Sequence, residues 1–252
     1  MWTVTNLGAI LFTKRPDGLD LLGRKAPRVI VYESTNKLKT KFDRPGTKGY
    51  AVGFQGLIEF INGLVPSDEI VVQASRREVK MFPEITVREL VANALIHQDF
   101  AQPGASVMIE LYDDRMEISN PGRPFISPER FIDEYQSRNE QLADLMRRLG
   151  ICEEKGSGVD KVVHAAEVFQ LPAPDSPVSE NRTSVVLFAH KEFEDMDKND
   201  RVRATYQHYC LRYVMNERMT NQSLRERFKQ PEDKVATVSQ VIAASDGGSG
   251  KN

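Results

Sequence analysis

Three polar residues on one face of an expected helix are the first candidates for chemistry. Glu89 and Asn93 stand four residues apart, with His97 a further turn along, so a helix places these side chains on one side. An amide oxygen can coordinate Mg²⁺, and a carboxylate can orient or deprotonate a water molecule. The spacing also fits structural roles, because Thr86 and Glu89 match a capping box and Asn93 suits the polar edge of a core.

Glycines mark two further candidate sites. Gly156 and Gly158 come directly before an expected helix, and Asn120-Pro121-Gly122 ends an expected strand. Glycines let a backbone approach a phosphate closely, and the free N–H groups at a helix start favour an anion. A simple turn is the alternative for both segments. The glycine-rich residues 247–252 are not a P-loop, because they lack its first glycine, end in Asn and follow no strand.

The surrounding pattern predicts the elements that position these candidates. Behind Pro83, apolar residues recur at helical spacing, which predicts a helix with one apolar face: Val87, Leu90, Val91, Ala94 and Leu95. Further helices are expected at 53–63, 128–135, 139–149 and 159–169, and strands at 6–12, 28–32, 70–79, 106–112, 115–119 and 184–189.

Composition excludes several classes of protein. The chain has 252 residues, is 40% hydrophobic and carries a net charge of −2, which is typical of a globular protein with one large and one small domain. No apolar run reaches the length of a membrane span and no signal-peptide pattern is present, so we expect a cytoplasmic protein that meets no membrane. The two cysteines and four histidines form no metal-ligand spacing, and no built-in zinc site is expected.

The charge is unevenly distributed along the chain. Residues 1–50 have a net charge of +6, residues 51–198 of −11 and residues 199–230 of +4. The acidic segment 191–200 is expected to be a linker, and short helices are expected beyond it at 201–215, 220–228 and 232–244. The predicted domains are therefore 1–190 and 201–252. Because the sequence opens within an expected strand, a further domain ahead of residue 1 is also predicted.

The basic C-terminal module has the pattern of a helix-turn-helix. Thr220 is placed to cap its second helix, and Pro231 precedes the third. In such a module Lys234, Thr237 and Gln240 would face the major groove of DNA. The phosphates would be contacted by Arg225, Arg227 and Lys229. No β-wing pattern follows the third expected helix. A small helical dimerisation bundle is the alternative.

Four segments, in this order, resemble a known family. They are Phe82–Phe100, Tyr112–Gly122, Ser137–Asn139 and Arg148–Gly158. Together they resemble the divergent GHKL, or histidine-kinase-type, ATPase domain of bacterial transcriptional regulators labelled RecG-like helicases. In that family the domain commonly follows a Schlafen-type AlbA domain and precedes a winged helix. The resemblance covers residues 5–190 and implies an α+β sandwich, with helices on one face of a mixed sheet, followed by a small all-α helix-turn-helix domain.

The resemblance also implies roles for single residues. Glu89 would be the water-activating base and Asn93 the Mg²⁺ ligand, while Gly156 and Gly158 would hold the phosphates of ATP, with Lys155 as a charge partner. Gly122 would leave room for the adenine. Asn120 stands where the wider superfamily has an aspartate that accepts a hydrogen bond from the adenine amino group. This is a departure from the family pattern, because an amide oxygen accepts a hydrogen bond but supplies no charge.

Three hypotheses about function follow. The first is a homodimeric, ATP-binding and DNA-binding transcriptional regulator, in which nucleotide closes a lid at about 123–155 and repositions the helix-turn-helix. The second is a DNA-binding or dimerisation scaffold with a vestigial nucleotide pocket, in which Asn120→Asp would restore binding. The third is a weak ATPase that DNA stimulates. Helicase activity is not expected, because the chain has no P-loop motor motifs.

Overall fold

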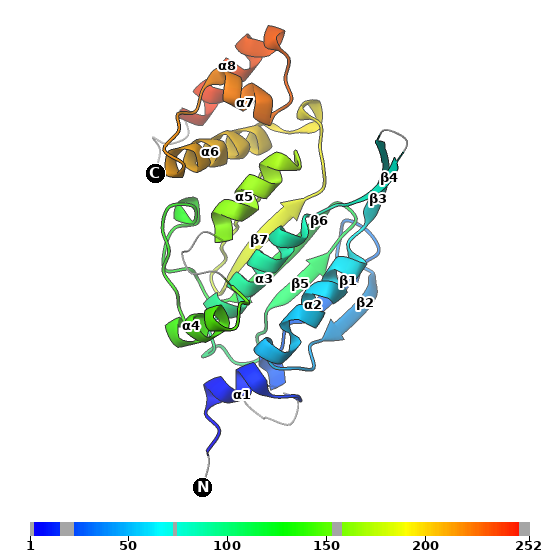
Figure 1. Cartoon of the computed structure of the whole chain (residues 1–252), viewed down its shortest axis with the longest axis vertical. Helices are drawn as coiled ribbons and strands as arrows, with labels where there is room; N and C mark the ends of the chain where they lie inside the picture. Colours follow the sequence, from blue (N-terminus) through cyan, green and yellow to red (C-terminus); the bar gives the residue numbers. More distant parts are fainter. Residues whose placement is uncertain (1–2, 16–22, 73–74, 153–157, 247–252) are drawn as a thin grey trace.

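A five-stranded mixed sheet forms the centre of the molecule. The computed structural model describes residues 3–15, 23–72, 75–152 and 158–246, and its main sheet has the order β2-β1-β5-β6-β7 (Figure 1). β1 pairs in parallel with β5, and the other neighbouring pairs are antiparallel. The strands are β1 (Arg28–Tyr32), β2 (Thr40–Pro45), β5 (Met108–Leu111), β6 (Arg115–Pro121) and β7 (Arg182–Phe188).

Helices cover one face of this sheet. They are α2 (Tyr50–Leu64), α3 (Glu84–His97) and α5 (Gly158–Val168), which lie side by side in Figure 1. Alternate strand residues such as Ile109 and Ile118 point toward them and join Leu95 of α3 in the main hydrophobic core. This arrangement confirms the expected α+β architecture. Because α3 lies between its two neighbouring helices and the sheet, residues on several of its sides are buried, and its polar side chains are held within the core layer.

Two strand predictions were wrong. The segment Asn6–Phe12 is the helix α1, capped by the Thr5 side chain, which accepts a hydrogen bond from the backbone N–H of Gly8. Its Leu7, Ile10 and Leu11 recur at helical spacing and pack on the main core. The expected strand 70–79 is a separate two-stranded sheet of β3 (Ser67–Val72) and β4 (Ser75–Lys80). Neither Gly nor Pro separates these two strands in the sequence, so no residue signals the turn.

The segment between β6 and α4 (Glu140–Arg148) also differs from the prediction. The helix expected at 128–135 is a single 3₁₀ turn, Pro128–Arg130. Arg130 pairs with Asp133 and Glu134 around this turn, so charges at helical spacing stabilise a turn instead of a helix. The helix expected at 139–149 is confirmed as α4, and Gly150 beyond its end has a φ of +68°, which suits a glycine at that position.

The C-terminal helices form a module with its own small core. They are α6 (Lys198–Val214), α7 (Asn221–Arg227) and α8 (Val235–Asp246), as the pattern predicted. Thr220 caps α7 in a capping box with Ser223. Phe193 and Met196, within the segment expected as a linker, are buried in this core together with Ala173. The segment 191–200 is therefore packed against its neighbours. In the described part of the chain no helix is both long and apolar enough to cross a membrane.

Candidate nucleotide site

Glu89, Asn93 and Gly158 converge at one point. Glu89 and Asn93 lie on α3, and Gly158 is the first residue of α5. A Cβ added to Gly158 would lie 2.9 Å from Oε2 of Glu89 and 3.3 Å from Nδ2 of Asn93. The backbone of Gly158 therefore abuts the carboxylate and the amide, and only a glycine fits there without moving one of them.

The alternative role of Glu89 as a helix cap does not fit this geometry. α3 begins at Glu84 with Pro83 as its N-cap, and no side chain makes the capping hydrogen bond. Glu89 lies in the second turn and is only 5% exposed. The hydroxyl of Thr86 is buried and has no hydrogen-bond partner among the residues that the structure describes. A buried carboxylate is costly unless it has a partner, and Glu89 does take part in an interaction of this kind.

Asn120 lies at the end of β6 and lines a cavity that Glu89, Asn93 and Gly158 also line, and Gly122 directly follows the strand. The side-chain Nδ2 of Asn120 donates to the backbone carbonyls of His97, at 3.4 Å, and of Pro121, at 3.1 Å. Gly122 has a φ of +101°, and a Cβ there would lie 2.9 Å from Cβ of Asp99. A glycine is thus required by both backbone conformation and crowding, in addition to any space that it leaves for a ligand.

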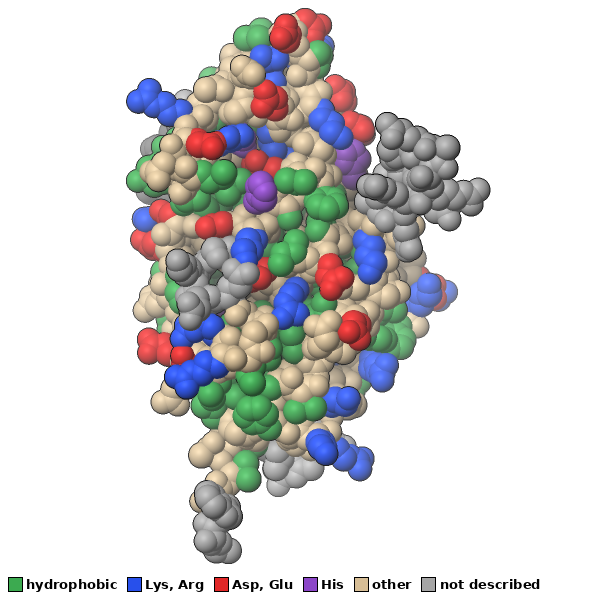
Figure 2. All heavy atoms as spheres, viewed as in Figure 1, with side chains coloured by type: hydrophobic (Ala, Val, Ile, Leu, Met, Phe, Trp, Pro, Cys, Tyr) green, Lys and Arg blue, Asp and Glu red, His purple; other side chains and the backbone are tan. Residues whose placement is uncertain are grey.

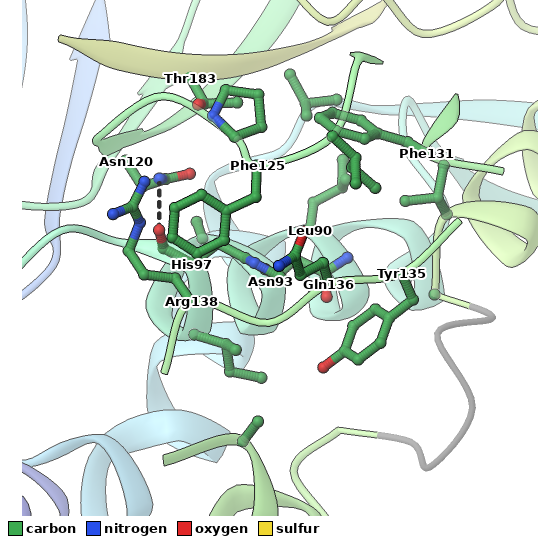
Figure 3. Close-up of a pocket in the computed structure, with 18 of the residues that line it drawn as sticks. Leu90, Asn93, His97, Asn120, Phe125, Phe131, Tyr135, Gln136, Arg138 and Thr183 are labelled. Carbon is green, nitrogen blue, oxygen red and sulfur yellow. Dashed lines mark hydrogen bonds between the residues drawn. The ribbon is translucent and has the colours of Figure 1, made fainter. Parts of the chain in front are cut away.

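A cavity connects these residues. Its walls come from α3, from the sheet and from the segment 123–138, which we call the lid segment (Figure 3). The apolar part of the wall includes Leu90, Ile118 and Val185, and the polar part includes Glu89, Asn93, Asn120 and Thr183. Thr183 donates to the carbonyl oxygen of Gly122 at 2.7 Å. A largely apolar cavity with a few convergent polar groups is the usual form of a small-molecule site.

His97, the third residue of the polar helix face, also lines this cavity. The residues that line it without having been assigned a role include Phe125, Tyr135 and Arg138 of the lid segment. The ring of Tyr135 meets that of His97 edge-on, with centroids 6.0 Å apart, and Arg138 donates to the carbonyl of Arg123 at 2.6 Å. His97 shares the helical face of Glu89 and Asn93, and Arg138 lies in a segment that carried the family resemblance. No sequence signal pointed to Phe125 or Tyr135.

Two titratable side chains that line the cavity, His97 and Cys152, have shifted pKa values. Burial, and after it the charge of Arg138, lowers the pKa of His97 to about 4. Burial, and after it the charge of Glu89, raises the pKa of the Cys152 thiol. Both side chains are therefore neutral near pH 7.

The lowered pKa of the partly buried His97 imidazole predicts a loss of stability in acid. The unfolded chain binds a proton at His97 near pH 6.5, whereas the folded chain does so only near pH 4, so the free energy of unfolding falls as the pH drops between these values. At pH 5 this loss amounts to roughly 2 kcal/mol. Urea unfolding at neutral pH and at pH 5 should show a smaller acid-induced loss in His97→Gln than in the native chain. An equal loss in both would contradict the assignment.

The structure describes some of the other predicted site residues, and these differ in how exposed they are. Lys155 and Gly156 lie outside the described residues. In the C-terminal module Lys229, Lys234 and Gln240 are exposed, while Arg225 and Thr237 are partly buried. Side chains of both charges mix over the visible face of this module (Figure 2).

The prediction that Arg227 meets DNA phosphates was wrong. Arg227 is only 5% exposed, and its Nη2 donates to the carbonyl of Leu171 at 2.7 Å. Its Nε lies 3.6 Å from a carboxylate oxygen of Glu167. Helix α7 presents this residue to α5, where the carboxylate of Glu167 and the carbonyl of Leu171 compensate the buried charge.

Comparisons with known proteins agree with this geometry. Residues 104–187 match the model of a family described as "Putative ATP-dependent DNA helicase recG C-terminal". This part of the chain resembles a histidine-kinase-type ATPase domain. The match covers β5, β6, the lid segment, α4, α5 and β7 except for its last residue, but it begins after α3, so Glu89 and Asn93 lie outside it. No curated protein matches the sequence.

A solved structure shows the same fold. The DIP2311 protein from Corynebacterium diphtheriae superimposes with a TM-score of 0.65 at 18% sequence identity, over 95% of this chain. At this identity the likeness concerns the fold alone. The chain spans about half of that protein, covering 49% of its length.

The ATPase-type resemblance implies a magnesium nucleotide, which the residues at the site fit. Among the residues that the structure describes, no group of three or more His, Cys, Asp or Glu could hold a metal ion alone. Mg²⁺ commonly needs only one or two protein ligands when phosphates supply the others. The amide of Asn93 beside the crowded backbone of Gly158 offers one such oxygen next to a helix start that favours phosphate.

Proposed function

We propose that this chain binds Mg-ATP in the cavity between α3, the sheet and the lid segment. The meeting of Glu89 and Asn93 of α3 with the backbone of Gly158 of α5 carries the proposal, because it brings a carboxylate and an amide to the start of a second helix. The α5 start at Gly158, together with Lys155 and Gly156, would hold phosphates, and Asn93 would hold the Mg²⁺. The bound ion would neutralise phosphate charge, while Glu89 would orient or deprotonate a water molecule.

Asn120 would select adenine. Its Nδ2 is used by two backbone carbonyls, which orients Oδ1 as the acceptor for an exocyclic amino group. Guanine presents an oxygen at that position, and two acceptors would then face each other. The same contacts argue against improved binding in Asn120→Asp, because a carboxylate would replace the donor and face the carbonyls of His97 and Pro121.

The C-terminal module would bind DNA and respond to the nucleotide. Its surface carries the exposed Lys229 and Lys234 between α7 and α8 and the exposed Gln240 on α8, which supports a helix-turn-helix with a smaller phosphate footprint than the pattern predicted. Homodimerisation through the same helices would complete a transcriptional regulator, and a scaffold with an inactive pocket is the alternative.

Contacts between the lid segment and α6 support communication between the two parts. The hydroxyl of Tyr206 donates to the carbonyl of Glu129 at 3.2 Å. Ile132 of the lid segment packs with Val163 of α5 and Leu211 of α6. A lid segment that moves on nucleotide binding would therefore displace a contact of the C-terminal module.

Equilibrium binding of ATP in the presence and absence of Mg²⁺ tests the proposal. Binding that needs Mg²⁺ and is lost in Asn93→Ala is expected. GTP should bind more weakly than ATP, because Asn120 presents an acceptor. A chain that binds neither nucleotide would leave the scaffold alternative.

A further inference from the structure

Phe125 is an exposed aromatic residue that lines the cavity. It retains 55% of its surface exposed, although it follows β6 closely and lines the cavity with Asn120 and Leu90. Figure 3 shows its ring beside Asn120, between that residue and Asn93. An apolar ring with this much exposed surface gains free energy when a flat ligand covers it.

Arg138 fixes the orientation of this ring. Its guanidinium carbon lies 4.3 Å from the centroid of the Phe125 ring, which is a favourable cation–π distance. The guanidinium is itself held, because Nη2 donates to the Arg123 carbonyl at 2.6 Å and Nη1 lies 4.0 Å from the Asp99 carboxylate. The ring lines the cavity and is more than half exposed, so it has surface that a ligand can cover.

An aromatic ring that can stack on a base and a hydrogen-bond acceptor that can reach the edge of the base together suit a nucleobase. Asn120 offers a hydrogen-bond acceptor to the edge of a base, and Phe125 offers a surface to its face. We propose that Phe125 is the residue on which the base of the nucleotide stacks, with Arg138 as the positioning residue that holds the ring. This inference rests on the proposed function and adds a specificity determinant that lies in the lid segment, outside the motifs that predicted the site.

The experiment separates base stacking from phosphate binding. Phe125→Ala should weaken ATP binding about ten- to a hundredfold and leave the binding of inorganic tripolyphosphate unchanged. Phe12→Ala is a matched control, because Phe12 is 51% exposed and lies on α1, and it should bind both ligands as the native chain does. Arg138→Ala should weaken ATP binding, and Arg138→Lys should restore part of it.

A tryptophan at position 125 provides a direct readout. The chain has one native tryptophan, Trp2, so Phe125→Trp is prepared in a Trp2→Phe background. Its fluorescence should be quenched by ATP and by adenosine, but not by tripolyphosphate. Unchanged or tighter ATP binding by Phe125→Ala overturns the inference, and tighter binding would mean that the ring blocks the base site. A native chain that binds neither ATP nor tripolyphosphate overturns the proposed function as well.

Discussion

Arg227→Ala is expected to lower the free energy of unfolding by about 3 kcal/mol, because the change breaks a buried polar network. Glu167 accepts from His208 at 2.9 Å and lies near Nε of Arg227, and His208 reaches Ser223 at 3.0 Å. Loss of the guanidinium would remove the donor to the Leu171 carbonyl and the nearby positive charge from the Glu167 carboxylate, in a site that is largely buried. Urea unfolding of the native and variant chains measures this loss.

Arg225→Ala is the matched control for this change. Arg225 lies on the same short helix but is partly exposed, and its Nε donates to Asn221 at 3.1 Å. We expect its replacement to change the free energy of unfolding by less than about 1 kcal/mol. An Arg227→Ala chain that is as stable as the native one but binds DNA more weakly would contradict the structural role and return Arg227 to the DNA surface.

Gly158→Ala is expected to weaken Mg-ATP binding by about tenfold or more. The new Cβ would lie 2.9 Å from Oε2 of Glu89, so the buried carboxylate must move away from the position that it shares with Asn93. The displaced carboxylate and the Asn93 amide would then lose contacts that they make only in the complex, and each 1.4 kcal/mol lost from binding is about tenfold in affinity. Isothermal titration calorimetry measures the change.

Gly56→Ala controls for the introduction of alanine into a helix. Gly56 lies on α2, and a Cβ there would meet nothing within 4 Å. This variant should bind Mg-ATP as the native chain does and should gain up to about 1 kcal/mol in free energy of unfolding. Native affinity in Gly158→Ala would mean that the nucleotide does not need Glu89, Asn93 and Gly158 in their present arrangement.

Elements with a long apolar period, or with a clear turn between them, were predictable from the sequence. The apolar period after Pro83 predicts α3. Asp113 and Asp114, between the expected strands 106–112 and 115–119, predict the β5–β6 hairpin, because both signals are local. The segment 6–12 was mistaken for a strand because its apolar residues are nearly continuous. The helical conformation of this segment depends on the Thr5 cap and on packing against the core. The apolar pattern of these seven residues alone does not contain that information.

The candidate site was only partly predictable, for a similar reason. Glu89 and Asn93 stand out because one helix fixes their spacing, and Gly158 stands out by its place before α5. Phe125 and Tyr135 lie in the irregular lid segment, where no period relates a side chain to a direction. The burial of Arg227 depends on Glu167 and Leu171, which are distant in the sequence, so its charge alone suggested a surface role.

Thermal unfolding with Mg-ATP tests the central claim most directly. At about a hundred times its dissociation constant, a ligand stabilises the folded chain by about 2.7 kcal/mol, which is a shift of several degrees for a chain of this size. We predict this shift in the native chain and in Asn36→Ala, whose exposed amide lies outside the cavity, and its loss in Asn93→Ala and after chelation of Mg²⁺. No shift in the native chain, or an equal shift in Asn93→Ala, would contradict the claim that α3 and α5 form a nucleotide site.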